Sequence, residues 1–190
     1  MCAACGAGFP VHDAAVAVPL PVRRAWALAR FEGAARRLLI DLKYHGVLRA
    51  GRALGARMAV AEGAGAVLDG TGLVVPVPLH WRRRWRRGHN QAAVLARALC
   101  ASRSDLTFCA ALRRRRATPP QVRLDRQRRL LNVHGAFRVR QRYREAFAGQ
   151  VTVLIDDVIT TGATTAAAAD ALIEAGAREV RVYAAAWAED

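Results

Sequence analysis

Two adjacent carboxylates stand close to a cluster of hydroxyl side chains near the end of this 190-residue sequence. Asp156 and Asp157 come first, and after two apolar residues the sequence continues with Thr160, Thr161, Gly162, Ala163 and Thr164. Carboxylates accept hydrogen bonds from sugar hydroxyls, whereas threonine hydroxyls and the free N–H groups of a helix N-terminus bind phosphate. The pattern therefore predicts a site for a phosphorylated sugar. The competing interpretation is an ordinary strand–turn–helix with threonine caps and a solvated acidic pair.

The segments around this motif predict the elements that position it. Val151–Ile155 is a β-branched apolar run, typical of a strand that is buried on both faces of a parallel sheet. An Ala-rich helix is expected over Ala163–Ala175, ended by Gly176, and a second strand over Glu179–Ala184. This strand–helix–strand order predicts an α/β fold with ligands at the carboxyl ends of the strands.

The rest of the chain gives weaker expectations. Residues 1–20 read as loop, and apolar spacing predicts helices over Ala25–Tyr44, with an interruption near Gly33, and over Leu48–Glu62. A buried strand begins at Leu73 and enters a proline-containing loop by Leu79. Three further segments are predicted as a helix, a solvated loop and a short strand: His89–Ser102, residues 113–131 and Val133–Val139.

Positive charge is concentrated in the middle of the chain. The sequence holds 30 Lys and Arg against 15 Asp and Glu, a net charge of +15. Between Arg82 and Arg144 there are nineteen Arg and two acidic residues, whereas from Glu145 onward there are two Arg and eight acidic residues. This asymmetry points to a polyanionic ligand, either a nucleic-acid backbone or a phosphorylated small molecule.

Composition excludes several classes of protein. Hydrophobic residues make up 53% and charged residues 24%, which excludes an intrinsically disordered chain. No apolar run is long enough to cross a membrane, and the N-terminus lacks the order of a signal peptide. The expectation is a cytoplasmic protein without membrane insertion.

The acidic pair and the threonine loop together resemble the phosphoribosyl-pyrophosphate (PRPP) signature of type I phosphoribosyltransferases. That resemblance implies a twisted, mainly parallel sheet flanked by helices. It also implies that Asp156 and Asp157 act as the catalytic residues that hold the ribose hydroxyls. The segment from Thr160 to Thr164 would then surround the 5′-phosphate, and Mg²⁺ would accompany PRPP.

Further motifs resemble one branch of this group, the ComF family (competence protein F, also called ComF/GntX). They recur in family order over roughly residues 25–187: Leu42-Lys43-Tyr44, Val75-Pro76-Val77-Pro78, Arg87-Gly88-His89-Asn90-Gln91, Leu112–Thr118 with Gln121, Arg129 with Asn132, and Gly135-Ala136-Phe137. The family is associated with DNA uptake during natural transformation. The resemblance divides the chain into residues 1–22, a partial zinc-finger-like segment, and residues 23–190, a phosphoribosyltransferase-like domain.

The resemblance also implies roles for two loops. Pyrophosphate binding falls on Pro76, Val77 and Pro78, with Arg87, Asn90, Gln91 and Lys43 as further candidates. A flexible loop that closes over the site would carry Arg116, Gln121, Arg129 and Asn132. The alternatives are a solvated arginine face and, for Lys43, a cation placed at a helix end by the helix dipole.

Cys2 and Cys5 form half of a tetrahedral zinc site. Members of the family commonly carry a four-cysteine finger here, and a start further upstream would complete it. As it stands, the chain is expected not to bind structural Zn²⁺ as a monomer. Cys100 and Cys109 are expected to be buried apolar residues.

Two functions from different classes follow. The first is a protein that binds PRPP or a related phosphoribosyl ligand and transfers the phosphoribosyl group to an acceptor. The second is a non-catalytic accessory protein that binds single-stranded DNA or another single-stranded nucleic acid through the Arg-rich segment 82–144.

Overall fold

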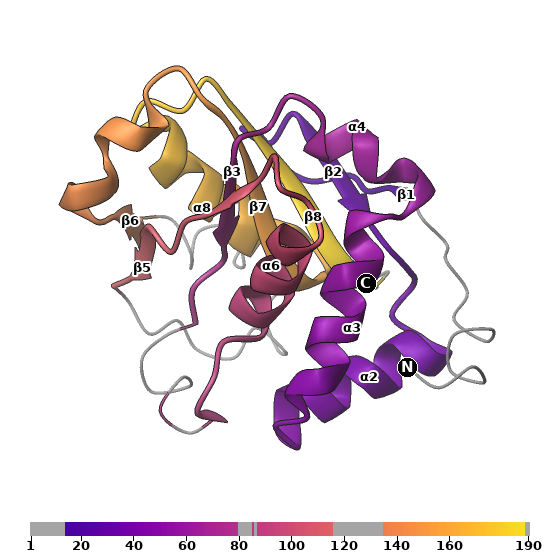
Figure 1. Ribbon diagram of the computed structural model, residues 1–190. Helices are drawn as coiled ribbons and strands as arrows, with labels where there is room; N and C mark the ends of the chain where they lie inside the picture. Colours follow the sequence, from indigo (N-terminus) through magenta and orange to yellow (C-terminus); the bar gives the residue numbers. More distant parts are fainter. Residues whose placement is uncertain (1–13, 80–84, 86, 116–134, 189–190) are drawn as a thin grey trace.

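A central sheet lies between two layers of helices in the computed structural model, which describes residues 14–79, 85, 87–115 and 135–188 (Figure 1). The sheet has the order β1-β2-β8-β7-β3-β4 and is parallel except for the β1–β2 pair. Its strands are β1 (Ala14–Ala15), β2 (Arg24–Ala27), β3 (Leu73–Pro76), β4 (Thr107–Phe108), β7 (Val151–Ile159) and β8 (Glu179–Trp187). The predicted α/β fold with a twisted, mainly parallel sheet flanked by helices is confirmed.

Helices cover both faces of this sheet (Figure 1). One face carries α2 (Gly33–Tyr44), α3 (Leu48–Ala59), η1 (Glu62–Ala64), α4 (Gly65–Leu68) and α6 (Gln91–Ala101). The other face carries α8 (Ala163–Ile173) and the separate antiparallel hairpin of β5 (Leu112–Arg114) and β6 (Phe137–Val139). Two short turns, η3 (Gln141–Tyr143) and η4 (Glu145–Phe147), connect β6 to β7.

The strands β7 and β8 divide the core into two clusters because successive side chains point to opposite faces of a sheet. Val153 and Tyr183 pack with α2, α3 and α6, whereas Leu154 and Val182 pack with α8 and the hairpin. All four are completely buried. The fully apolar strand read in the sequence is thus explained by burial on both faces.

A glycine sets how closely α3 and α6 approach each other. A Cβ at Gly55 would lie 2.7 Å from the Cβ of Ala98 and would also meet the backbone of Leu95. Because no other residue leaves this space, the two helices pack with their backbones nearly in contact. The N-terminus of α6 is thereby held over the carboxyl ends of β3 and β7.

The structure differs from the sequence-based expectations at several segments. The expected helix from Ala25 begins only at Gly33, because residues 24–27 pair with β8 as a parallel strand. The helix expected over Leu48–Glu62 ends at Ala59, and Ala14–Ala15 form a short strand within the expected loop. Leu112–Arg114 pair with β6 at the start of the expected solvated loop.

The elements around the motif agree with expectation, although β7 is longer. The strand continues through both aspartates to Ile159, and α8 begins at Ala163. Gly176 follows α8 with a φ of +103°, in keeping with its predicted capping role.

Within the part of the chain that the structure describes, no helix combines the length and the apolar character that crossing a membrane requires.

Candidate functional site

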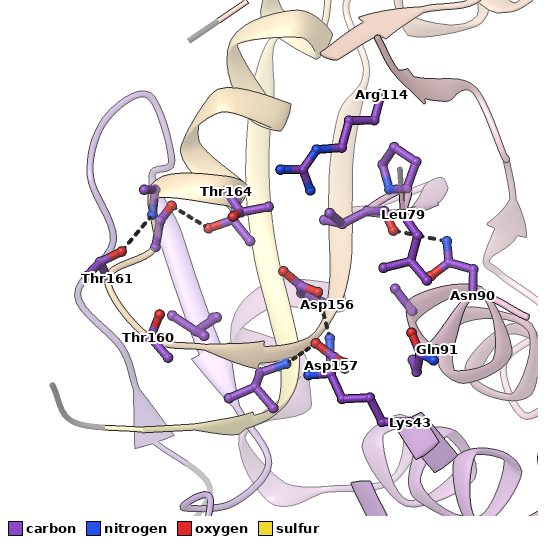
Figure 2. A pocket seen from close by; sticks show the side chains of 18 of the residues that line it. Lys43, Leu79, Asn90, Gln91, Arg114, Asp156, Asp157, Thr160, Thr161 and Thr164 are labelled. Carbon is purple, nitrogen blue, oxygen red and sulfur yellow. Dashed lines mark hydrogen bonds and ion pairs between the residues drawn. The ribbon is translucent and has the colours of Figure 1, made fainter. Parts of the chain in front are cut away.

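A cavity of about 180 Å³ lies at the carboxyl ends of β3 and β7 (Figure 2). We call it the acidic pocket, because Asp156 and Asp157 form part of its wall. The first residues of α6 and of α8 face it from two sides. The structure brings together here thirteen of the residues singled out in the sequence: Lys43, Val77, Pro78, Arg87, Asn90, Gln91, Asp156, Asp157, Thr160, Thr161, Gly162, Ala163 and Thr164.

Backbone N–H groups orient the two carboxylates. The N–H of Asp157 donates to Oδ1 of Asp156 at 2.8 Å, and the N–H of Val158 donates to Oδ1 of Asp157 at 2.8 Å. Each carboxylate keeps its second oxygen for another partner. Although neighbouring strand residues usually point to opposite faces, both aspartates reach the cavity because it lies at the edge where the strands end.

The environment of Asp156 favours its neutral form. Burial, followed by the negative charge of Asp157, raises the pKa of the Asp156 carboxyl to about 8. The Lys43 ammonium acts in the opposite direction but does not offset burial. At neutral pH, a ligand that brings positive charge or a hydroxyl donor close to Asp156 would therefore stabilise the ionised carboxylate.

Lys43, the only lysine in the sequence, is paired with the other carboxylate. Its Nζ lies 3.1 Å from Oδ2 of Asp157, and both side chains are mostly shielded from solvent. Lys43 belongs to the last turn of α2, as the helix-end interpretation expected, and also lines the cavity. The structure therefore combines the two alternatives that the sequence left open.

The ring of His89 connects the end of α2 to the segment before α6 through contacts with two backbone carbonyl groups. Its Nε2 lies 2.6 Å from the carbonyl oxygen of Leu42, and its Nδ1 lies 2.8 Å from the carbonyl oxygen of Arg87. Leu42 directly precedes Lys43. The ring of His89 thus fixes the backbone beside two cationic residues of the acidic pocket.

The N-terminal turn of α8 forms the opposite wall. Gly162 has a φ of +71°, which L-residues with a side chain rarely adopt. A Cβ at this position would lie 2.8 Å from Cγ1 of Val18 and 2.9 Å from Cδ of Pro19. Gly162 therefore allows the Val18–Pro19 segment to pack closely against this turn.

Threonines stabilise this turn from within. The N–H of Ala163 donates to Oγ1 of Thr161 at 3.5 Å, and Oγ1 of Thr165 donates to the carbonyl oxygen of Gly162 at 2.8 Å. Thr160 is exposed and Thr164 is partly exposed. Ala163, Thr164 and Thr165 of the first turn of α8 line the cavity, and N–H groups in the first turn of a helix have no partner within the helix.

The loop after β3 forms the third wall, and Asn90 holds it. Nδ2 of Asn90 donates to the carbonyl oxygen of Val77 at 3.0 Å. Oδ1 of Asn90 is buried and accepts no hydrogen bond from the described residues. Pro76, which was grouped with Val77 and Pro78, lines a neighbouring cavity instead.

Arg87 is held by two neighbours at the entrance of α6. Its Nη1 donates to Oε1 of Gln91 at 3.4 Å, and its guanidinium lies 5.2 Å from the centre of the Tyr44 ring. Gln91 itself is buried. Both residues line the acidic pocket, which explains why uncharged donors follow the arginine run at this point.

Six residues that line this pocket were not predicted as site residues: Leu79, Ala92, Arg114, Val158, Ile159 and Thr165. Leu79 and Arg114 line it together with the predicted set (Figure 2). Arg114 lies in β5, opposite Phe137, and its guanidinium stacks 5.3 Å from the centre of that ring. Because Arg113, Arg114 and Arg115 are identical in type, only the pairing of the hairpin distinguishes the one that faces the cavity.

The remaining predicted residues fall outside the described part of the chain: Cys2 and Cys5, the proposed half zinc site, and Arg116, Gln121, Arg129 and Asn132, the proposed closing loop. Cys109 is buried, as expected, whereas Cys100 is partly buried, and both are free thiols. Burial raises the pKa of the Cys100 thiol to about 11, as suits an apolar rather than a reactive role.

Solved structures give a weak likeness. Glutamine PRPP amidotransferase from B. subtilis, complexed with ADP and GMP, superposes with a TM-score of 0.47 at 20% identity over 71% of this chain and 26% of that one. A second structure, the allosteric regulatory enzyme of purine biosynthesis, gives 0.46 at 20% identity over 71% and 25%. A likeness of this size transfers neither a ligand nor a reaction to this chain.

Sequence relatives are closer. The DNA utilization protein YhgH of Escherichia coli K12 is 38% identical over 110 residues, which are 58% of this chain and 47% of the relative. Competence protein F of Haemophilus influenzae is 34% identical over 110 residues, 58% of this chain and 48% of the relative. The match thus spans about half the length of these relatives, and no protein-family model matches the chain. Over the matched residues, these two relatives confirm the resemblance of the chain to the ComF family.

Proposed function

We propose that the acidic pocket binds PRPP and that the protein transfers the phosphoribosyl group to an acceptor. The observation that carries the proposal is the convergence of an acidic pair and two helix N-termini on one cavity. A ligand that satisfies both must combine hydroxyl donors with at least two anionic groups. PRPP has this combination, since its ribose carries a phosphate at one end and a diphosphate at the other.

The acidic pair suits the ribose hydroxyls. Asp157 has an oxygen 3.1 Å from Lys43, so that its charge is compensated before any ligand enters. Among the described residues, no cation lies within ion-pair distance of Asp156, and desolvation raises the pKa of its carboxyl. Two hydroxyl groups that donate to these carboxylates would replace the hydration that burial has removed.

The helix N-termini suit the phosphates. The 5′-phosphate would be bound by the first turn of α8, where the Gly162 backbone and the threonine hydroxyls face the cavity. The diphosphate would lie towards the first turn of α6, with Arg87 and Arg114 as cations. At about 180 Å³ the cavity is smaller than the roughly 300–1,000 Å³ of most small-molecule sites. We therefore expect the cavity to enclose the ribose phosphate and the diphosphate to lie at its mouth.

Magnesium fits this pocket as a partner of the ligand. Among the described residues, no group of three His, Cys, Asp or Glu side chains could hold a metal without further ligands. In phosphate sites, however, Mg²⁺ is usually bound by one or two carboxylates together with phosphate oxygens. Asp156 and Asp157 supply the carboxylates, and a bound Mg²⁺ would neutralise charge on the diphosphate as it leaves.

The proposed transfer exchanges one bond for another at C1 of the ribose. The bond between C1 and the diphosphate oxygen breaks, and the electron pair leaves with the diphosphate. A nucleophilic atom of the acceptor forms the new bond to C1 and loses its proton to solvent or to a base. The residues of the acidic pocket bind and orient the ribose, and the positive helix ends stabilise the departing charge.

Calorimetric titration of PRPP into the protein with and without MgCl₂ tests the binding step. We expect binding that requires Mg²⁺ and that weakens at least tenfold in Asp157→Asn. Glu62→Gln, which removes one exposed carboxylate elsewhere, serves as the matched control and should bind as the wild type does. If PRPP gave no heat with folded protein, or if Asp157→Asn bound as tightly as the control, the proposal would be wrong.

The names of the relatives suggest the process. YhgH is called a DNA utilization protein, and its Haemophilus counterpart is competence protein F. We infer that this chain serves DNA uptake or the use of incoming DNA. Deletion of its gene in a naturally transformable host should lower the transformation frequency, and complementation with Asp157→Asn should fail to restore it if the acidic pocket is required.

A further inference from the structure

A second cavity, of about 400 Å³, lies beside the acidic pocket. We call it the arginine pocket, because Arg97, Arg113, Arg114 and Arg140 line it. Pro78, Leu79, Asn90 and Arg114 belong to both cavities, so the loop after β3 separates them. None of the described residues that line the arginine pocket is acidic. The described lining of the arginine pocket thus offers guanidinium groups without a carboxylate, whereas that of the acidic pocket contains both.

One side of the arginine pocket is a flank of α6. Ala93, Val94 and Arg97 follow one another at the spacing of a single helix face. The other sides come from β4, β5 and the residue after β6, which contribute Phe108, Leu112 and Arg140. The cavity thus combines an apolar surface with guanidinium groups from three different segments.

Arg97 is already fixed in position. Its guanidinium lies 4.0 Å from the centre of the Phe108 ring, stacked on one face of the aromatic group. A stacked guanidinium loses less conformational entropy when it binds an anion, and its N–H edges remain available for two parallel hydrogen bonds to a phosphate. A planar group can also stack on the face of the guanidinium that is turned away from Phe108.

These features select a chemical class of ligand. Inorganic phosphate would use the arginines and leave the apolar surface uncovered, whereas an uncharged heterocycle would place no anion on the guanidinium groups of Arg97, Arg113 and Arg140. A volume of about 400 Å³ falls within the usual range of sites for whole small molecules. We propose that the arginine pocket is a second ligand site that binds a nucleoside monophosphate, with the phosphate on the arginines and the base against the apolar flank of α6.

The site shares Arg114 and the loop after β3 with the proposed PRPP site, but it contains neither aspartate nor any residue of the α8 turn, so the two can be tested separately. Calorimetric titration of AMP, with inorganic phosphate and adenosine as comparison ligands, tests it. We expect AMP to bind at least tenfold more tightly than either comparison ligand. Arg97→Ala and Arg140→Ala should each weaken AMP binding at least tenfold.

Arg138→Ala is the matched control. Arg138 lies on the same hairpin but faces a different hollow, beside Arg144 and Glu174, so the variant removes an equal charge outside the pocket. It should bind AMP within about twofold of the wild type.

Three results would overturn the proposal. The first is phosphate binding as tightly as AMP, which would indicate a plain anion site. The second is equal losses in Arg138→Ala and Arg97→Ala, which would indicate a general charge effect. The third is loss of AMP binding in Asp157→Asn but not in Arg97→Ala, which would place the nucleotide in the acidic pocket. PRPP binding, measured on the same samples, reports separately on the function proposed above.

Discussion

The acidic pocket and the arginine pocket share a wall but attract anions in different ways. In the acidic pocket, positive potential comes from backbone N–H groups at two helix N-termini and from Lys43, Arg87 and Arg114, and the carboxylates provide hydroxyl acceptors. In the arginine pocket, it comes from guanidinium groups on an apolar lining without any described carboxylate. The first arrangement demands a ligand of defined stereochemistry, whereas the second demands charge and a flat apolar group. The specificity of the acidic pocket therefore depends on Asp156 and Asp157, although the chain as a whole is basic.

The largest expected effect separates the two pockets most clearly. In the double variant Asp156→Asn/Asp157→Asn, PRPP affinity should fall at least ~100-fold, or about 2.7 kcal/mol, because the charge of Asp157 is removed and each side chain keeps only one oxygen. AMP binding in the arginine pocket should change less than about twofold. Titrations of both ligands on one preparation measure the contrast, and parallel losses would show that the pockets are not separate sites.

Gly162→Ala should lower the free energy of unfolding by about 2–4 kcal/mol. The φ of +71° strains any side chain, and the new Cβ would meet Val18 and Pro19. Gly149→Ala is the control, since Gly149 has a φ of +70° and a Cβ there would meet nothing within 4 Å. Urea unfolding of both variants measures the difference, and equal destabilisation would show that the Val18–Pro19 segment does not pack against the turn.

Protonation of Asp156, in the acidic pocket, should make the free energy of unfolding depend on pH. The unfolded carboxyl titrates near pH 4 and the folded one near 8, so between these values the folded state holds more protons and wild-type stability falls as pH rises. Asp156→Asn has no titrating carboxyl at this position and should therefore not lose stability in this way. Its advantage should be absent near pH 4 and should grow to about 1–3 kcal/mol by pH 8.

Urea unfolding at pH 4.5, 6 and 8 measures this advantage. Arg97→Ala, in the arginine pocket, should differ from the wild type by a constant amount over the same range, because an arginine does not titrate there. An advantage of Asp156→Asn that shrinks towards pH 8 would contradict the raised pKa.

The smallest effect concerns Lys43. Lys43→Met leaves Asp157 without its cation, and PRPP affinity should fall about tenfold, or about 1.4 kcal/mol. Lys43→Arg keeps the charge and should retain most of the affinity. If the methionine and arginine variants lost the same affinity, shape rather than charge would be the contribution of Lys43 to the acidic pocket.

The sequence predicted the acidic pocket well because most of its residues are close neighbours in the chain. The order of strand, aspartates, threonine turn and helix is local, so the residues from Asp156 to Thr164 could be placed without knowledge of distant contacts. The ion pair between Lys43 and Asp157 joins residues more than a hundred positions apart. Only the packing of α2 over the sheet brings them together.

The arginine pocket was not predicted because its residues, like Lys43 and Asp157, lie far apart in the sequence. Its wall combines α6, the end of β4 and the β5–β6 hairpin, and its arginines come from positions far apart in the sequence: Arg97, Arg113, Arg114 and Arg140. The strand Arg24–Ala27 was also missed, because three of its four residues, Ala25, Trp26 and Ala27, are apolar and fit a helical pattern as well as an extended one. In both cases, tertiary pairing decides what the local pattern leaves open.

The position of β8 has a consequence for biosynthesis. β8 lies between β2 and β7, and its residues Arg181–Ala184 pair with Arg24–Ala27. During translation β2 therefore emerges long before its partner, because more than 150 residues separate it from β8 in the sequence. Because closing so long a loop precedes the pairing, we expect the sheet to be completed late and slowly, with the nascent chain depending on protection from aggregation until then.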